Sequence, residues 1–465
     1  MAADRGLVWT LCAAVACSTS DPEAQPDTPV ATDTGSVAAE SSGPPPDPAS
    51  SDSGLVGSSG GSTGVADETS GEGDSSSSSG AAPEPTVTPL RITDTNRAHV
   101  DMHGGWGPHL RAPMHGPDGA LWFAYDGGPG VLSNTTVHYA QLGADGWSTV
   151  ASQPHGPGIQ QNAAHVLRDA SIVTYGIDTT GNRLEQCTFD TSALAGSCST
   201  VDIGGPYSTP LNSNYVGAAL GPANETVVWF TVVGAAGGQG QFLYTYDYGG
   251  GWNGPVVSAL PGYNDMAYVR AHFRGPSLID WVGQAYIGAY PNGSYAIGVG
   301  EVDFGQAAAF ETLGPAPLAG EAVRNAGDVW IDPVNGDAHA LARVDAEMHY
   351  YYLPNGSPWA DALQPVQTIP GMVRARWLHE DGGPLVLVGS GGGVEVRWAE
   401  PGAAIDWTVA PSLPVEIEAE GLDNPTAIYA SGPQYQTAAV TGLHFALCGA
   451  YGVSDHEIWH VSVEL

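Results

Sequence analysis

From residue 112 onwards, one short pattern recurs along this chain at a nearly constant spacing. An alanine is followed two positions later by an apolar or aromatic residue, and successive alanines are 49 to 55 residues apart. The copies are Ala112/Met114, Ala164/Val166, Ala218/Leu220, Ala271/Phe273, Ala375/Trp377 and Ala427/Tyr429, with Ala326/Asp328 as an imperfect seventh. A fixed period of this length indicates a fold that is built from one repeated supersecondary unit.

Each alanine opens a module of short β-rich runs that are separated by turn residues. In the first module these runs are 121–125 and 137–139, and a further run opens at Trp147. Fourth runs open at Trp147, Cys198, Trp252, Phe310, Trp359 and Trp407. The 64 glycines and 36 prolines among 465 residues suit a fold with many tight turns and few helices. Four short strands per module predict an all-β fold, a seven-bladed β-propeller, with six blades as the alternative if the weak Ala326 module is an insertion.

The ends of the repeat region suggest how such a ring closes. The seventh module ends after its third run at Leu465, and residues 87–93 form a spare strand just before the first module. We therefore predict that this spare strand completes the last blade, because closure removes the two exposed sheet edges of an open array. The marker alanines are expected on the innermost strands, where large side chains would clash.

The N-terminal region has the composition of an export signal followed by a tether. An apolar run ends in Ala14-Val15-Ala16-Cys17, which resembles the lipobox of bacterial lipoproteins. This resemblance implies that Cys17 is acylated and that the protein is an outer-membrane or cell-surface lipoprotein, with simple secretion as the alternative. The segment 18–86 is rich in Ser, Gly, Pro and acids, so we expect a disordered tether. The predicted organisation is a signal peptide at 1–17, the tether at 18–86 and the propeller at 87–465.

Charge and motif spacing limit the partners of the chain. A formal net charge of −36 argues against nucleic acid and anionic membrane surfaces, so we expect membrane contact only through the lipid anchor. The literal His-Glu-x-x-His sequence at 456–460 runs into an alternating β pattern, in which its two histidines lie too far apart to share a zinc ion. We expect a monomer with no metal and no cofactor.

Cysteine placement predicts one disulfide. Cys187 and Cys198 flank a turn within one module, and an exported protein can keep such a pair oxidised. Cys448 stands alone in an apolar run and is expected to be a small buried residue.

Several arginines occupy equivalent positions in different modules. Arg111, Arg270 and Arg374 each directly precede a marker alanine, while Arg324 and Arg376 lie within two residues of one. Equivalent positions of different blades converge on the ring axis, so these side chains are candidates for one binding site at the face where the innermost strands begin. His165, His272, Trp106 and Tyr263 are further candidate ligand-binding residues from the same segments.

Two local motifs resemble the sialidase-like, Asp-box (BNR-repeat) propellers. Thr245-x-Asp247-x-Gly249-x-x-Trp252 matches the Asp-box turn, and Arg111-Ala112-Pro113-Met114 resembles the opening of sialidases. That family implies a cluster of arginines that clamps the carboxylate of a sialic acid. Three functions follow: a non-catalytic surface lipoprotein that binds a glycan or another extracellular partner such as a protein, an exo-sialidase-like glycoside hydrolase, or a scaffold without a small ligand. We favour the first, with catalytic residues unassigned.

Overall fold

The computed structural model describes residues 84–92, 112–127, 136–154, 164–178, 183–202, 212–232, 240–249, 251–287, 294–318, 327–344, 347–417, 427–448 and 458–465. The chain divides into two units, residues 1–78 and 79–465, and every described residue belongs to the second. The predicted signal peptide, Cys17 and most of the tether lie outside the described residues. Within the described residues, no helix has the length and apolar character needed to cross a membrane.

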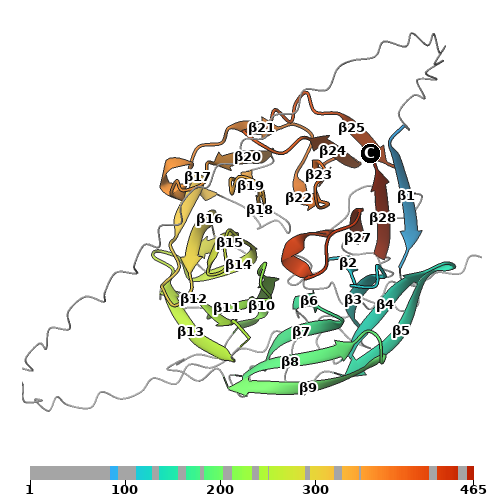
Figure 1. Cartoon of the computed structure of the whole chain (residues 1–465). Helices are drawn as coiled ribbons and strands as arrows, with labels where there is room; N and C mark the ends of the chain where they lie inside the picture. Colours follow the sequence, from blue (N-terminus) through green and yellow to red (C-terminus); the bar gives the residue numbers. More distant parts are fainter. Residues whose placement is uncertain are drawn as a thin grey trace, which may run out of the picture. The chain divides into compact units, whose positions relative to one another are not determined.

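The described residues form seven four-stranded antiparallel sheets that are arranged as the blades of a ring (Figure 1). The protein is therefore a seven-bladed β-propeller, as predicted. The alternative of six blades is wrong, because the module after Ala326 forms a complete sheet of its own. In the first six blades the strands follow the chain order from the axis outward.

We number the blades in chain order. Blade 1 contains β2 (Met114–His115), β3 (Leu121–Gly127), β4 (Thr136–Gly143) and β5 (Gly146–Pro154). Blade 2 contains β6 (Ala164–Arg168), β7 (Ser171–Asp178), β8 (Arg183–Asp190) and β9 (Ala195–Asp202). Blade 3 contains β10 (Asn212–Leu220), β11 (Thr226–Val232), β12 (Gln241–Asp247) and β13 (Trp252–Ala259). Blade 4 contains β14 (Asp265–Phe273), β15 (Leu278–Ile287), β16 (Ser294–Asp303) and β17 (Glu311–Leu318).

The remaining blades include two short 3-10 helices. Blade 5 contains β18 (Gly327–Ile331), β19 (Ala338–Val344), β20 (Glu347–Leu353), η4 (Trp359–Asp361) and β21 (Gln367–Ile369). Blade 6 contains β22 (Arg374–His379), β23 (Leu385–Ser390), β24 (Val394–Ala399) and β25 (Ser412–Val415). Blade 7 contains β26 (Ala427–Ala430), η5 (Pro433–Tyr435), β27 (Leu443–Cys448), β28 (Ile458–Glu464) and β1 (Thr86–Arg91).

The marker alanines that the structure describes lie where the sequence placed them, either within an innermost strand or, for Ala112, two residues before one. Ala164, Ala218, Ala271 and Ala375 are at most 4% exposed. The innermost strands of neighbouring blades approach one another around the axis, and a methyl group fits there without displacing the adjacent backbone.

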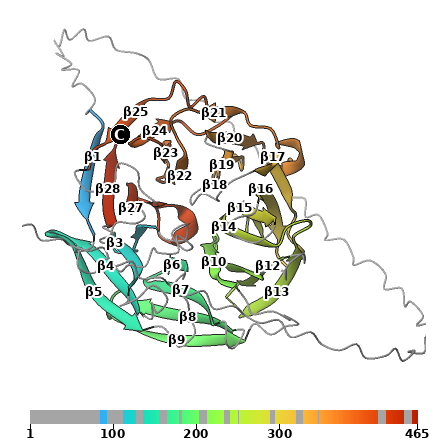
Figure 2. The same cartoon turned by 180° about the vertical axis from the view of Figure 1, so that it is seen from behind.

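The N-terminal strand closes the ring. Strand β1 pairs antiparallel with β28 along its whole length, from Thr86 opposite Glu464 to Arg91 opposite Trp459. Figures 1 and 2 show the blue β1 beside the dark red β28, although the two strands come from opposite ends of the propeller sequence. The prediction of closure by this strand is confirmed.

The apolar core is distributed between neighbouring blades. Phe123 of blade 1 and Tyr429 of blade 7, for example, are fully buried with ring centroids 5.8 Å apart. Val87 of β1 packs against the cluster shared by blades 6 and 7. Pairing and packing therefore both tie the first strand to the last blades.

Two of the expected fourth strands begin later than the sequence indicated. Trp359 lies in η4 and Trp407 lies before β25, so neither tryptophan opens a strand. Both indole rings are buried, at 2% and 0% exposure. Burial of these large rings in the preceding loops explains why an aromatic residue alone was a poor marker of a strand start.

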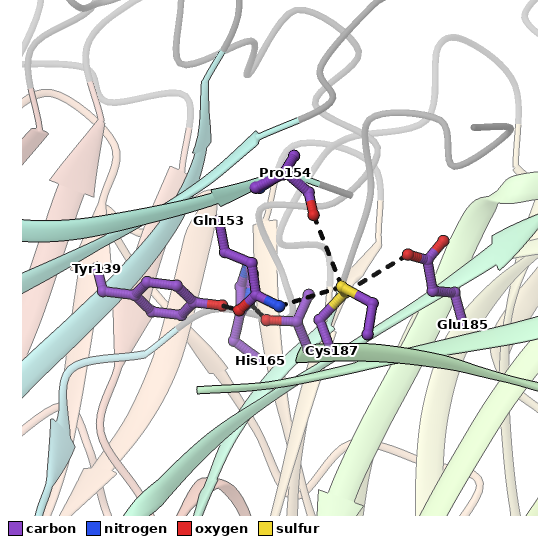
Figure 3. The surroundings of a disulfide bond; sticks show 8 residues. Tyr139, Gln153, Pro154, His165, Glu185 and Cys187 are labelled. Atoms are coloured by element: carbon purple, nitrogen blue, oxygen red, sulfur yellow. Dashed lines mark hydrogen bonds between the residues drawn. A yellow bond between two sulfur atoms is a disulfide. The ribbon is translucent and has the colours of Figure 1, made fainter. Parts of the chain in front are cut away.

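Blades 1 and 2 meet beside a disulfide. Cys187 of β8 and Cys198 of β9 are directly opposite each other and are bonded. Figure 3 shows Gln153 of blade 1 reaching the sulfur atoms, with its Nε2 3.2 Å from Cys198 Sγ and its Oε1 3.3 Å from the Tyr139 hydroxyl. The Cys187–Cys198 disulfide that the cysteine spacing predicted thus links the two outer strands of blade 2 where this blade contacts blade 1.

A cluster of histidines lies at the seam between the last and first blades. His444 Nδ1 and His460 Nε2 are 3.0 Å apart, and the His115 and His444 rings are 4.9 Å apart between centroids. Burial, together with the neighbouring histidines, lowers the pKa of His444 to about 4 and that of His460 to about 3. Burial also lowers the pKa of His115, although Asp381 opposes this effect. These rings are therefore neutral at pH 7 and can share a hydrogen bond.

Removal of β1 should open the ring. A chain that begins at residue 93 leaves the β28 edge unpaired, so we expect a lower Tm and association of the protein through this edge. A chain that begins at residue 84 retains β1 and is the matched control. Differential scanning calorimetry and light scattering measure both effects, and equal Tm values for the two chains would contradict closure by β1.

The histidine seam predicts acid sensitivity with a definite sign. The unfolded chain takes up protons near pH 6.5 while folded His444 and His460 do so only near pH 4 and 3, so stability is complete above pH 6.5 and falls as the pH is lowered toward 4. His460→Gln should reduce this loss by roughly 1–3 kcal/mol between pH 7 and pH 4. Urea unfolding of wild type and variant at several pH values measures the difference. Identical pH slopes would show that the seam does not contribute.

Candidate functional site

A pocket of about 490 Å³ lies where the innermost strands of blades 3 to 6 end. Its lining includes the last residues of four of these strands: Leu220 of β10, Phe273 of β14, Ile331 of β18 and His379 of β22. Tight turns follow the strands; in blade 5, Asp332 Oδ1 accepts the Val334 amide at 2.8 Å and the Asp332 carbonyl accepts the Gly336 amide at 2.8 Å. Four blades thus each present one strand end and one turn to the same space.

One wall of the pocket comes from blade 7. We call residues 431–441, which join β26 to β27 and contain η5, the crossing segment. Figures 1 and 2 show the orange-red chain beside β27 extending to the centre of the ring. Its residues Pro433, Gln434, Gln436 and those at 437–439 line the pocket.

The crossing segment is attached to blades on several sides of the ring. Gln436 Oε1 accepts the His115 amide of blade 1 at 2.7 Å, and the Thr437 amide donates to the Leu167 carbonyl of blade 2 at 3.0 Å. Arg270 of blade 4 donates to the Tyr435 hydroxyl. On the blade 6 side, the Val440 amide donates to Asp381 at 3.2 Å. These attachments fix the wall of the pocket in place.

The pocket residues carry buried polar atoms without hydrogen-bond partners. These atoms are His272 Nε2, Trp330 Nε1, His379 Nδ1 and Gln434 Oε1. The four residues are at most 7% exposed. An unsatisfied buried polar group costs about 1–3 kcal/mol, so these residues give the wall of the pocket an unused capacity for hydrogen bonds.

Burial keeps the pocket histidines neutral. It lowers the pKa of His272 to about 4, with a smaller contribution from His379. It also lowers the pKa of His379, although Asp381 and Asp332 oppose the effect. His272 Nδ1 lies 3.1 Å from the Phe273 carbonyl, which can only accept, so Nδ1 donates there and Nε2 is left as an acceptor for a ligand hydroxyl group.

The carboxylate and guanidinium groups that line the pocket are two carboxylates and one guanidinium that is paired with a buried carboxylate. Asp332 and Asp381 both line the pocket. Arg274 also lines it, but its Nε and Nη2 donate to Asp280 at 2.8 and 2.6 Å in a bidentate pair. Asp280 is fully buried and also accepts the Trp359 indole N–H at 2.8 Å. Burial raises the pKa of Asp280 to about 6, against the opposing charge of Arg274.

The arginines predicted from the sequence do not form an open cluster within the described residues. Arg270 and Arg376 are 3% and 1% exposed and interact electrostatically; burial and the charge of Arg270 lower the pKa of Arg376 to about 9. Arg376 donates to the Gly327 carbonyl and to the Ala375 carbonyl. Arg374 is partly buried at the start of β22. Arg111, Arg324 and Trp106 lie outside the described residues.

Of the other predicted ligand-binding residues that the structure describes, which are His165, His272 and Tyr263, only His272 lines the pocket. His165 is buried, with its Nδ1 2.9 Å from Thr174 Oγ1. Tyr263 packs against Phe310, with ring centroids 5.2 Å apart, and its hydroxyl lies 3.5 Å from Thr312 Oγ1. Both residues thus belong to the packing of their own blades.

The pocket opens at the opposite end of the innermost strands from the one that the sequence analysis favoured. Sequence reasoning concentrated on the residues before each marker alanine and missed those that follow it by several positions. The pocket could have been found from polar residues that stand at the end of an apolar strand or directly after it. His379, Asp332 and Asp381 are such residues. The crossing segment has no periodic pattern that could have placed it at the axis.

Comparisons with known proteins give only distant structural similarity. No family model matches the chain, and no curated protein matches it. A protein of Dyadobacter fermentans is similar with a TM-score of 0.43, 10% identity and coverage of 82% of this chain and 99% of that one. The α-L-arabinanase of Penicillium chrysogenum has a TM-score of 0.40, 11% identity and coverage of 68% and 94%. The fucose-specific lectin of Aleuria aurantia has a TM-score of 0.36, 14% identity and coverage of 82% and 94%. At these values none of the similarities assigns a function.

The buried pair of Arg274 and Asp280 should be essential to the pocket wall. Asp280→Ala leaves the 7% exposed guanidinium of Arg274 uncompensated and the Trp359 indole unbonded, so we expect a loss of about 3–5 kcal/mol in unfolding free energy. The double variant Arg274→Met/Asp280→Leu removes both charges and should lose clearly less. Chemical denaturation of both variants measures the difference. Equal losses would contradict a compensating pair.

Proposed function

We propose that the protein binds a carbohydrate in the pocket at the ends of the innermost strands. The observation that carries the proposal is the set of four buried polar atoms without partners on His272, Trp330, His379 and Gln434, in residues that line one pocket. Sugars present many hydroxyl groups that both donate and accept, and neutral histidine, amide and indole groups are suitable partners for them. Phe273 and Trp330 supply the apolar surface that a sugar ring also requires.

We propose that this binding role is non-catalytic, which is the role that we favour from the sequence. The N-terminal lipobox-like sequence and the acid-rich tether suggest a binding domain that is held away from a cell surface. A glycan is then the partner that we propose, with the propeller as a recognition module. A scaffold without a small ligand is the less favoured role, because it gives the polar lining of this pocket no function.

Hydrolysis of a glycan is the second candidate function. Asp332 and Asp381 line the same pocket, and glycoside hydrolases use a pair of carboxyl groups as acid and as base or nucleophile. Asp332→Asn and Asp381→Asn should each abolish turnover if the pair is catalytic while leaving binding measurable. Release of reducing ends from the glycan that binds separates this candidate from binding alone.

A single amide tests the binding proposal. Gln434→Ala removes a side-chain oxygen that has no partner within the protein, so the fold should keep its Tm while affinity for the glycan falls roughly 5- to 50-fold. Gln186→Ala, on a partly buried glutamine of β8 in blade 2, is the matched control. A glycan array followed by isothermal titration calorimetry measures affinity. Unchanged affinity in Gln434→Ala, or no glycan bound by the wild type, would contradict the proposal.

A further inference from the structure

An aromatic row begins at the pocket and ends at the protein surface. We call Phe273, Phe304, Tyr246 and Tyr248 the aromatic shelf. Phe273, which lines the pocket, has its ring centroid 5.7 Å from that of Phe304, which in turn lies 4.7 Å from Tyr246 in a stacked arrangement. Tyr246 and Tyr248 are 5.4 Å apart. The shelf therefore continues without a break from blade 4 to the β12–β13 turn of blade 3.

The shelf becomes steadily more accessible with distance from the pocket. Phe273 is 7% exposed, Phe304 and Tyr246 are partly buried, and Tyr248 is 49% exposed. In a four-stranded antiparallel sheet the turn after the first strand and the turn after the third lie at the same end of the strands. The turns after β12 and β16, which carry Tyr248 and Phe304, thus lie on the face of the ring that carries the pocket.

Hydrogen bonds hold the shelf in one arrangement. The Tyr244 hydroxyl accepts the Gly305 amide at 2.9 Å, and the Phe304 amide donates to the Ser277 carbonyl at 2.9 Å. Asp247 Oδ1 accepts the amides of Gly249 and Gly251 at 2.7 and 3.0 Å, which fixes the turn beneath Tyr248. A ligand that lies on these rings would therefore incur little cost of ordering them.

Charged groups near the shelf and the pocket are mainly acidic. Burial raises the pKa of the Tyr248 hydroxyl, and Tyr246 and the nearby acids Asp303 and Glu225 raise it further. Asp332 and Asp381 line the pocket. Among the described residues, Arg274 pairs with Asp280 and Arg168 with Asp247 at 3.9 Å, while Arg270 is buried beneath the crossing segment and donates to the Tyr435 hydroxyl. A uronate or sialate would meet like charge at this face, whereas a neutral sugar would not.

We propose that the ligand is a neutral oligosaccharide, with one sugar in the pocket and the following units lying over Phe304, Tyr246 and Tyr248. This inference rests on the proposed carbohydrate function and adds the length and charge of the ligand. Sugar rings have apolar faces that pack on aromatic rings, and each such contact adds a modest increment to affinity. The protein should accordingly distinguish a chain from a monosaccharide, and a neutral chain from an acidic one.

The test uses ladders of arabinose, xylose and glucose oligomers from the monosaccharide to the hexasaccharide, with oligogalacturonates as the acidic series. Calorimetry with the full propeller should show affinity that rises with length in a neutral ladder, and no binding of the acidic series. Tyr248→Ala should remove roughly 3- to 10-fold of the affinity for the longer oligomers and leave that for the shortest binder unchanged. Tyr248→Phe retains the ring and should behave as wild type.

Each other outcome has a distinct meaning. Affinity independent of length, or equal affinities for wild type and Tyr248→Ala, overturns the shelf but leaves the pocket proposal intact. Preference for the acidic ladder overturns the assignment of a neutral ligand. A roughly 5- to 50-fold loss of affinity in Gln434→Ala, together with affinity that rises with length in the wild type, supports pocket and shelf together. No binding of any ladder by the wild type contradicts the proposed function and this inference with it.

Discussion

Closure of the ring by β1 and β28 is the constraint on which the rest of the structure depends. Each blade packs its faces on its two neighbours, so an open ring would leave two apolar faces and one strand edge in water. Pairing of all six residues of β1 with β28 removes that edge. The histidine seam lies at the same boundary. Burial disfavours the charged forms of His115, His444 and His460, so the three rings pack together in their neutral forms. Blade 7 consequently both closes the ring and contains histidines whose protonation at low pH destabilises the fold.

Closure also positions the pocket. The crossing segment leaves blade 7 and bonds to blades 1, 2, 4 and 6, which are held at fixed distances only in a complete ring. Tyr435 meets the buried Arg270, while Gln434 and Gln436 line the pocket. A site assembled from four strand ends and one crossing segment is rigid because each part is held by a different blade. This arrangement suits recognition by preformed contacts, in which little ordering accompanies binding.

The fold could be predicted from the sequence because it depends on a repeat, whereas the pocket depends on the exceptions to that repeat. Alanines such as Ala271 and Ala375 marked the innermost strands because the axis tolerates only small side chains at those positions. The closing strand followed from a module that was one strand short. Trp359 and Trp407 misled the placement of two outer strands, since buried loops accept large rings as readily as strands do. The pocket residues come from four modules and a non-repeating loop, so no single stretch of sequence contains the site. Arg270 and Arg376 are buried because of how neighbouring blades pack, which the spacing of the repeat does not describe.

The central claim, that a neutral glycan binds at the ends of the innermost strands, is tested most directly by a crystal structure of the protein with the neutral oligomer that it binds best. We expect one sugar ring among Phe273, His379 and Gln434, with hydrogen bonds to the atoms that have no partner within the protein, and further rings extending toward Tyr248. A glycan bound instead at the other face of the ring, beside Arg374 at the start of β22, would contradict the account.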